Sequence, residues 1–245
     1  MKKMTLSPTR SLPCPAALAA SCPTRTPRSD SRAALIRATW QTQMALSLAL
    51  KRLLDISIAT GAVLALSPLL IGTAIAIRLE SPGSVLFFQE RVGFKGRRFR
   101  MIKFRSMRVG ADAEKAALAA ANESADGVIF KMKQDPRITK VGRLIRRLSI
   151  DELPQIFNVL RGDMSIVGPR PPVPGEVEQY SSTERKRLEA KPGLTCLWQI
   201  GGRSNVPFSG QVMLDVAYLE KQSLWEDLRI IVKTVPAVLS GRGAY

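Results

Sequence analysis

The chain has 245 residues, enough for one domain of ordinary size with some chain to spare. It carries 37 lysines and arginines against 20 aspartates and glutamates, a formal net charge of +17, so its expected partners are anionic: nucleic acid, phosphorylated ligands or an acidic membrane surface. The chain has no histidine, which excludes imidazole bases, Ser-His and Cys-His nucleophiles and His-ligated metals. Its three cysteines form no CxxC pair and indicate neither a zinc cluster nor a disulfide framework.

The first 43 residues have the composition of a disordered tail. They hold five prolines, eleven serines and threonines, seven basic residues and one acid, with no apolar spacing that would support ordering. We therefore predict a disordered basic tail over residues 1–46. A signal peptide is one alternative, because Lys2 and Lys3 precede an apolar stretch, but Pro13 and Pro15 interrupt it. A translation start after the tail is another.

A single long apolar run follows the tail. Ile56 to Ile77 contains 22 residues without a charge, and about 20 suffice to cross a bilayer as a helix. A buried helix of a soluble protein is usually shorter and keeps a polar face. Pro68 removes a backbone hydrogen bond in the middle of the run, and Ser67 can bend the helix further. Because basic residues flank both ends, we predict a re-entrant membrane helix over residues 47–82, broken at Ser67-Pro68, with both ends cytoplasmic.

After the apolar run the pattern changes to that of a β-hairpin. The strands are expected at Val85–Gln89 and Phe99–Arg105, joined by a glycine-containing loop. On two-residue periodicity Lys103 and Arg105 share one face of the second strand, where they could hold phosphate oxygens. A solvated basic strand face is the alternative.

Helical patterns dominate the next part of the chain. Residues 111–124 are alanine-rich and predict a surface helix with little chemistry. Apolar spacing predicts further helices over 141–148 and 153–160, the first of which turns Arg146 to another face.

The junction between those two helices carries two adjacent acids. Ser149-x-x-Glu152 matches a capping box, but Pro154 would then lie at the fifth helical position, where its missing N–H forfeits a bond. A cap at Asp151 avoids this conflict, so helix capping by Asp151 is a sufficient structural interpretation.

A catalytic interpretation of the same acids comes from their surroundings. An ionised carboxylate can attack phosphorus without a general base, which suits a chain without histidine. Arg170 lies in a stiff Gly-Pro-Arg-Pro-Pro turn and could present its fork of donors to a phosphate, although a solvated turn is the alternative. Seven basic residues flank the acids in the sequence and would keep them ionised if they lie close: Lys131, Lys133, Arg137, Lys140, Arg143, Arg146 and Arg147.

Over about residues 47–245 the chain resembles the bacterial sugar transferases known as monotopic phosphoglycosyl transferases. The resemblance is carried by long motifs, in chain order Lys51-Arg52-x-x-Asp55, Ser67-Pro68, FFQERVG from Phe87, KFRSM from Lys103, DPRIT from Asp135, SIDELPQIFNVLRGDMSIVGPRP from Ser149, KPGLT from Lys191 and the terminal GRGAY.

The resemblance implies a two-step reaction that starts exopolysaccharide or glycan assembly. Asp151 would attack the β-phosphate of a UDP-sugar and release UMP, and undecaprenyl phosphate would then take the phosphosugar. Glu152 would support metal binding or proton transfer, with Mg²⁺ held at Asp151 and Glu152, and Lys103, Arg146 and Arg170 would hold phosphates.

The expected fold is α+β and mainly helical, with the re-entrant helix, a small β-hairpin and interfacial amphipathic helices. Residues 83–245 are expected to form a cytoplasmic catalytic domain at the inner membrane of a bacterium. Amphipathic spacing from Leu224 to Val235, with Trp198 and Trp225, suits helices at a membrane interface, and ordinary core packing explains it equally well.

Two departures from the family pattern stand out. Cys196 occupies a position where the family usually has glycine, and it would add strain if that backbone has a positive φ. We also expect a minimal catalytic form, without the multi-helix membrane domain of larger members.

The main alternative is a non-enzymatic, membrane-bound basic protein that recruits anionic lipid or partners of polysaccharide assembly. A nucleic-acid-binding function rests on charge alone, so no nucleic acid partner is expected.

Overall fold

The structure is a computed structural model that describes residues 27–111, 113–114, 132 and 134–240. The chain divides into two units, Met1–Leu46 and Ser47–Tyr245. In the first unit, residues 27–46 are helical and form the start of α1 (Pro27–Glu80), so the expected disorder is wrong for this stretch. After Pro27 it has neither proline nor glycine and is rich in good helix formers. Residues 1–26 of the expected tail lie outside the described part.

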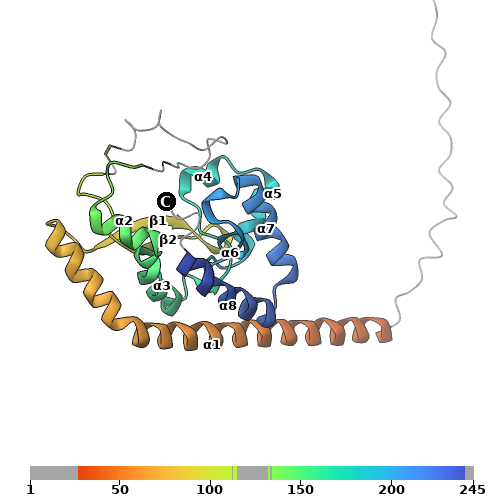
Figure 1. The fold of residues 1–245 in the computed structure, drawn as a ribbon. Helices are drawn as coiled ribbons and strands as arrows, with labels where there is room; N and C mark the ends of the chain where they lie inside the picture. The colour runs from red at the N-terminus through yellow and green to blue at the C-terminus, as the bar shows by residue number, and fades with distance from the viewer. Residues whose placement is uncertain (1–26, 112, 115–131, 133, 241–245) are drawn as a thin grey trace, which may run out of the picture. The chain divides into compact units, whose positions relative to one another are not determined.

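In the second unit α1 carries the apolar run and bends within it. Pro68 lies inside the helix, and Ser67 Oγ donates a hydrogen bond to the carbonyl oxygen of Leu64 at 2.9 Å. Figure 1 shows the helix turning sharply in its later part. By length and composition α1 could cross a membrane, and only 11% of its most apolar 18-residue window is buried, unlike the core helix of a soluble protein. The re-entrant path itself stays a prediction.

The predicted hairpin is confirmed. Strands β1 (Leu86–Val92) and β2 (Arg98–Phe104) pair antiparallel, with η1 (Phe94–Gly96) at the turn. Side chains alternate between the two faces of such a pair. The cross-strand pairs Leu86↔Phe104 and Phe88↔Ile102 therefore share one face, and Phe87↔Lys103 and Gln89↔Met101 share the other.

The acidic junction differs from the capping prediction. Helix α2 (Lys140–Arg147) is followed by η3 (Ile150–Gln155) and α3 (Ile156–Arg161). Asp151 is not a cap but lies inside η3, and Ser149 precedes η3 in a left-handed conformation, without a side-chain capping bond. A 3₁₀ turn accommodates Pro154 and leaves both acids free to point elsewhere. The alanine-rich helix expected over 111–124 falls mostly outside the described residues.

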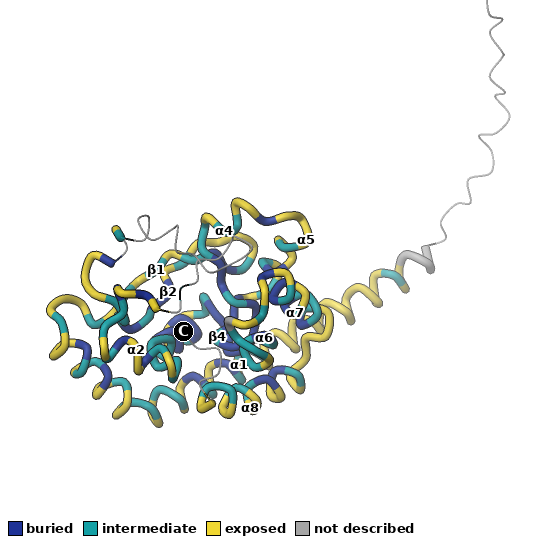
Figure 2. The backbone as a smooth tube through the Cα atoms, turned by 45° about the horizontal axis from the view of Figure 1, so that its top comes forward, coloured by how far each residue is buried: buried dark blue, intermediate teal, exposed yellow. Residues whose placement is uncertain are grey.

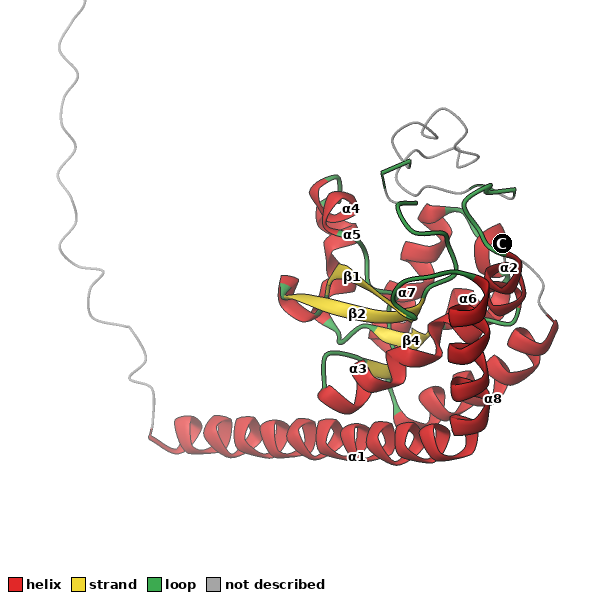
Figure 3. Ribbon diagram, turned by 90° about the vertical axis from the view of Figure 1, so that its left-hand side faces the viewer, coloured by secondary structure: helices red, strands yellow, loops and turns green. Residues whose placement is uncertain are grey.

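Short strands and helices complete the second unit, which confirms a mainly helical α+β fold (Figure 3). Strands β3 (Ser165–Val167) and β4 (Gly193–Thr195) pair in parallel. The remaining elements are α4 (Pro174–Glu178), α5 (Ser182–Arg185), η4 (Lys186–Glu189), α6 (Leu197–Gly201), η5 (Arg203–Asn205), α7 (Phe208–Lys221) and α8 (Leu224–Ser240).

The core of the second unit joins α1 to the rest of the unit. Ala59 of α1 packs in one buried cluster with Met101, Val159 and Ile230, which come from β2, α3 and α8. Figure 2 shows the buried residues gathered inside the unit, while much of α1 and α8 is exposed. On α8, Ile230 is buried but Trp225 is 76% exposed, so this helix has both a core face and an apolar outer face. Its location at a membrane interface stays a prediction.

The Lys-Arg-x-x-Asp motif of α1 anchors the helix by buried polar contacts. Lys51 Nζ contacts Asp227 Oδ2 at 2.5 Å, and Arg52 donates to the carbonyl oxygens of Val159 and Leu160 at 2.6 and 2.8 Å. Asp55 Oδ1 accepts hydrogen bonds from the Ser165 hydroxyl and the Ile166 amide. The motif thus fixes the start of the apolar run to α3, β3 and α8.

Candidate active site

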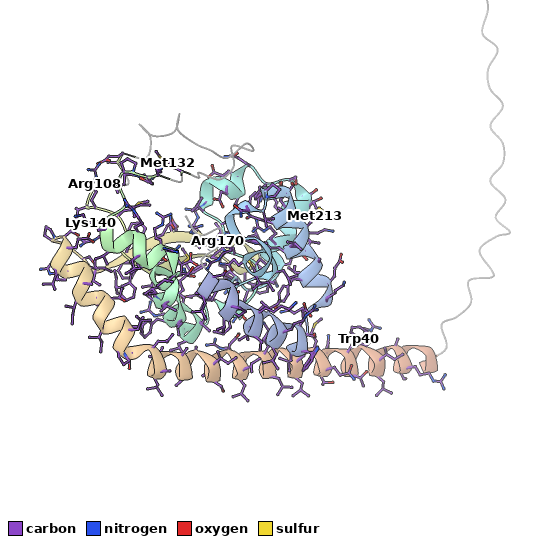
Figure 4. All side chains as sticks on the ribbon, in the orientation of Figure 1. Trp40, Arg108, Met132, Lys140, Arg170 and Met213 are labelled. Atoms are coloured by element: carbon purple, nitrogen blue, oxygen red, sulfur yellow. The ribbon has the colours of Figure 1, made fainter. Side chains whose placement is uncertain are left out.

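A cleft of about 670 Å³ runs across the second unit. It is lined by all five residues that the sequence singled out for catalysis and phosphate binding, Lys103, Arg146, Asp151, Glu152 and Arg170. The structure therefore brings together side chains from β2, α2, η3 and the segment after β3. In Figure 4 Arg170 lies inside the unit, whereas Met132 and Lys140 lie toward its edge.

The position of Arg170 follows from a close approach of two chain segments. Gly168 and Gly193 face each other where β3 and β4 end: a Cβ on Gly193 would lie 2.0 Å from the Gly168 nitrogen. Only glycine fits at such a contact. The hydrogen bond from the Gly193 amide to the Pro169 carbonyl, 2.9 Å, holds the turn that carries Arg170.

Glu152 is the electrostatic partner of two cleft cations. Its Oε1 accepts hydrogen bonds from Lys103 Nζ at 2.9 Å and from Arg170 Nη2 at 3.0 Å. Burial alone would raise the pKa of Glu152, but the charges of Arg170 and Lys103 outweigh burial and hold its pKa well below the usual range. Burial lowers the pKa of Lys103, an effect that Glu152 opposes. Glu152 is therefore ionised at every pH at which the protein is folded.

Asp151 has the opposite character. Burial and the neighbouring charge of Glu152 raise its pKa to about 6, while Lys103, Arg146 and Arg170 partly offset them. Within the described residues its carboxylate makes no hydrogen bond, so it is not tied to a neighbour. Two adjacent carboxyl groups with separated pKa values are typical of sites that give them different tasks.

Two arginines of the cleft were missed as site residues in the sequence. Arg91 donates to Gln89 Oε1 and to the Pro171 carbonyl, and burial together with the charge of Arg170 lowers its pKa to about 10. Its only signal was membership of the FFQERVG motif. Arg203 donates to Ser149 Oγ at 2.6 Å from a distant part of the chain. No local pattern pointed to Arg203, because the contact depends on tertiary folding.

Two further expectations are settled by geometry. Arg105 lines the cleft, but its guanidinium donates to backbone oxygens of Ser81 and Pro82 and so ties the hairpin to the end of α1. Cys196 has φ −151° and ψ 171°, an extended backbone that any residue adopts, so it adds none of the expected strain. Its buried thiol donates to Gln199 Oε1 at 3.2 Å.

The donor set bears on the expected magnesium ion. Among the described residues there is no group of three or more acidic, cysteine or histidine side chains that could hold a metal. Asp151 and Glu152 nevertheless fit Mg²⁺, which is commonly held by one or two carboxylates together with substrate phosphates. The residues therefore suit an ion shared with a bound substrate and not a cage built by the protein alone.

An apolar groove of about 470 Å³ lies on the other face of the hairpin. The cross-strand pairs Leu86↔Phe104 and Phe88↔Ile102 form one wall, and α1 around Ser67 forms another. Pro154 and Phe157 close it, so η3 and α3 contribute apolar residues here while η3 gives its acids to the cleft. Leu86 and Phe104 line both spaces. The hairpin therefore separates a basic cleft from an adjoining apolar groove.

This arrangement suits an enzyme that acts on phosphorylated, partly apolar substrates, and comparison with known proteins identifies its family. Residues 46–241 match the family described as bacterial sugar transferase. The chain belongs to this family of transferases, which confirms the resemblance seen in the sequence.

Curated relatives share 41–50% of their residues with the chain. Galactosyl transferase CpsE of Streptococcus agalactiae is 50% identical over 200 residues, 79% of this chain and 43% of the relative. Exopolysaccharide production protein ExoY of Sinorhizobium fredii is 42% identical over 198 residues, 80% of this chain and 88% of the relative. UDP-glucose:undecaprenyl-phosphate glucose-1-phosphate transferase of Caulobacter vibrioides is 41% identical over 203 residues, 80% of this chain and 72% of the relative. The chain thus spans less than half of the streptococcal relative.

Proposed function

We propose that the protein transfers a sugar 1-phosphate from a UDP-sugar to undecaprenyl phosphate, starting exopolysaccharide or glycan assembly. The observation that carries this proposal is the carboxylate pair in the basic cleft, with Glu152 bound to two cations and Asp151 unbound. The names of the relatives supply the substrates, a galactosyl or glucosyl donor and a polyprenyl phosphate acceptor.

In the first step an oxygen of ionised Asp151 attacks the β-phosphorus of the UDP-sugar. The bond from this phosphorus to the bridging oxygen breaks, and its electron pair leaves with UMP. Asp151 then carries the phosphosugar as an acyl phosphate, an intermediate that needs no general base to form. Lys103, Arg146 and Arg170 stabilise the charge on the phosphate oxygens.

In the second step a phosphate oxygen of the lipid acceptor attacks the same phosphorus and returns Asp151 to its carboxylate form. The acceptor joins a charged head to an apolar chain, and the basic cleft adjoins the apolar groove at Leu86 and Phe104. The two spaces therefore match the two parts of the acceptor.

Asp151, Glu152 and the diphosphate together would hold Mg²⁺, which would neutralise charge on the diphosphate and on the departing UMP. We further propose that the reaction takes place at the cytoplasmic face of the bacterial inner membrane, where α1 enters the bilayer.

The test is UMP release by protein in nanodiscs supplied with Mg²⁺, undecaprenyl phosphate and a panel of UDP-sugars headed by UDP-galactose and UDP-glucose. We expect one sugar to support UMP release and Asp151→Asn to lower it by at least about 10⁴-fold, since the nucleophile is gone. Intact mass measured without acceptor should show the phosphosugar adduct only in the unmutated protein. Glu220→Gln, an exposed carboxylate on α7, is the matched control.

A non-enzymatic recruiting protein predicts another result. Its function would survive Asp151→Asn, and folded protein in nanodiscs would release no UMP from any sugar. The buried ion pairs around Glu152 favour the enzyme, because desolvating this many charges is costly unless they serve a ligand.

A further inference from the structure

Ser149 and Arg203 form a contact in the cleft that the proposed chemistry has not yet used. Arg203 Nη2 donates to Ser149 Oγ at 2.6 Å, and both residues line the cleft. Ser149 stands two residues before Asp151 in the chain. Burial lowers the pKa of Arg203, while the nearby charges of Glu152 and Asp151 raise it. The guanidinium therefore lies within electrostatic reach of both acids.

The backbone of both residues is unusual. Ser149 has φ 54° and Arg203 has φ 53°, and among the described non-glycine residues the only other positive φ is at Lys95, in the hairpin turn. Left-handed backbone at a residue with a side chain is unfavourable and persists where the surrounding structure enforces it, often at active sites. Two such residues from distant segments, joined side chain to side chain, indicate a purpose beyond chain reversal.

Arg203 also keeps a donor in reserve. Its Nη1 is buried and makes no hydrogen bond within the described part of the chain. Lys103 and Arg170 each direct a donor to Glu152, and Arg91 is held by Gln89 and Pro171. A buried cationic donor without an acceptor calls for one, and the ligand of this cleft is a phosphate compound.

The stereochemistry of the two steps says which phosphate this is. Attacking and leaving oxygens lie in line on either side of a transferred phosphorus. UMP must therefore leave on the side opposite Asp151, and the acceptor must later attack from that same side. The phosphate of UMP and the phosphate of the lipid thus occupy one place in turn.

We propose that Arg203, held by Ser149, forms this shared phosphate subsite and contacts the UMP phosphate in the first step and the lipid phosphate in the second. The inference rests on the proposed function. Arg203 is then a catalytic residue that stabilises the leaving oxygen of UMP, and Ser149 is a positioning residue.

The first test is binding in nanodiscs, measured with UMP and geranyl phosphate as probes. We expect the two probes to compete for one site, and Arg203→Ala to weaken both about tenfold or more. Arg147→Ala removes an exposed arginine of α2 and should change neither by more than about twofold. Simultaneous binding of both probes, or a loss confined to one of them, would overturn the shared subsite.

The second test is steady-state kinetics, in which kcat/KM for each substrate of a two-step exchange reports its own half-reaction. Arg203→Ala should lower kcat/KM for the UDP-sugar and for the acceptor alike, each by about 100-fold, the typical effect of removing one such donor. Added guanidinium ions should restore part of both. Ser149→Gly, which suits a positive φ and removes only the hydroxyl, should have a smaller effect in the same direction.

The outcomes separate this inference from the function on which it rests. If the unmutated protein turns over UDP-sugar and Arg203→Ala does not impair it, the subsite is wrong and the function stands. If the unmutated protein releases no UMP but the two probes compete and depend on Arg203, the function is wrong and the subsite stands. A fall in activity with a lowered Tm and no rescue by guanidinium would assign Arg203 a structural role and overturn the inference.

Discussion

At the scale of single residues, the division of labour between Asp151 and Glu152 sets a pH dependence. The nucleophile must be ionised, and burial and Glu152 raise the pKa of Asp151 to about 6. We predict that kcat/KM for the UDP-sugar is constant above about pH 7 and falls about tenfold per pH unit below 6. A pH profile of UMP release measures this. An acid limb that begins only near pH 4 would show that Asp151 has an ordinary pKa.

Glu152→Gln offers an internal check on that profile. The substitution removes the neighbouring negative charge that helps raise the pKa of Asp151, so the acid limb should move to lower pH in whatever activity remains. Lys103 and Arg170 would lose their counter-charge, and we expect a lower Tm, because a buried cation without its partner is destabilising.

The same carboxylate should weaken the fold. The native pKa of Asp151 lies above its unfolded value of 3.8, so the native state binds the proton more tightly and loses stability as pH rises. The loss is complete above pH 6 and absent below about pH 3. Asp151→Asn should therefore raise the free energy of unfolding by up to about 3 kcal/mol at pH 8. Thermal unfolding across pH would show the gain in Tm shrinking toward acid, whereas a gain that is the same at all pH values contradicts this cause.

Which of these residues the sequence could predict depends on the range of their contacts. The five predicted site residues meet in one cleft because the family motifs around Lys103, Asp151 and Arg170 were already legible in the chain. Asp151 was misplaced as a helix cap, since local propensity cannot foresee that Glu152 binds Lys103 from a strand 49 residues away. Arg203 gave no local signal for the same reason, its partner being 54 residues distant.

At the scale of elements, the contacts of Asp55 show how α1 is held. Asp55 is 5% exposed and accepts hydrogen bonds from Ser165 Oγ and the Ile166 amide of β3 at 3.0 and 2.9 Å. Asp55→Ala leaves both donors buried without partners and should cost about 3 kcal/mol. Asp55→Asn keeps an acceptor and should cost about 1 kcal/mol. The measurement is thermal or denaturant unfolding in detergent.

A surface pair gives the matched comparison. Arg98 and Glu90 of the hairpin are 3.4 Å apart with side chains 62% and 53% exposed, so Arg98→Ala should change stability by less than about 1 kcal/mol. Equal effects of Asp55→Ala and Arg98→Ala would mean that α1 is not anchored through Asp55. The hairpin and α2 were predictable from their short periodic patterns, but this anchoring was not, because it joins residues 110 or more positions apart.

At the scale of the whole molecule, both ends of the apolar run contact one and the same folded unit. Lys51 before the run pairs with Asp227, and Glu80 after it accepts hydrogen bonds from the Lys140 and Val141 amides at the start of α2. A straight helix through the 22 residues between would be about 33 Å long and would carry its ends to opposite faces of a bilayer. The bend at Ser67-Pro68 is what lets both ends reach the same unit.

We therefore predict that residues on both sides of the run face the cytoplasm. Single cysteines at the exposed positions Leu50 and Leu79, in a chain whose own three cysteines are replaced, would be labelled with a membrane-impermeant maleimide in spheroplasts and in inverted vesicles. Both should react in inverted vesicles and neither in spheroplasts. Labelling of the two on opposite faces would make α1 a span and separate Lys51 from Asp227. In that case Lys51→Ala should leave Tm unchanged, whereas the re-entrant helix predicts a clear loss, because Asp227 would remain buried without its cation.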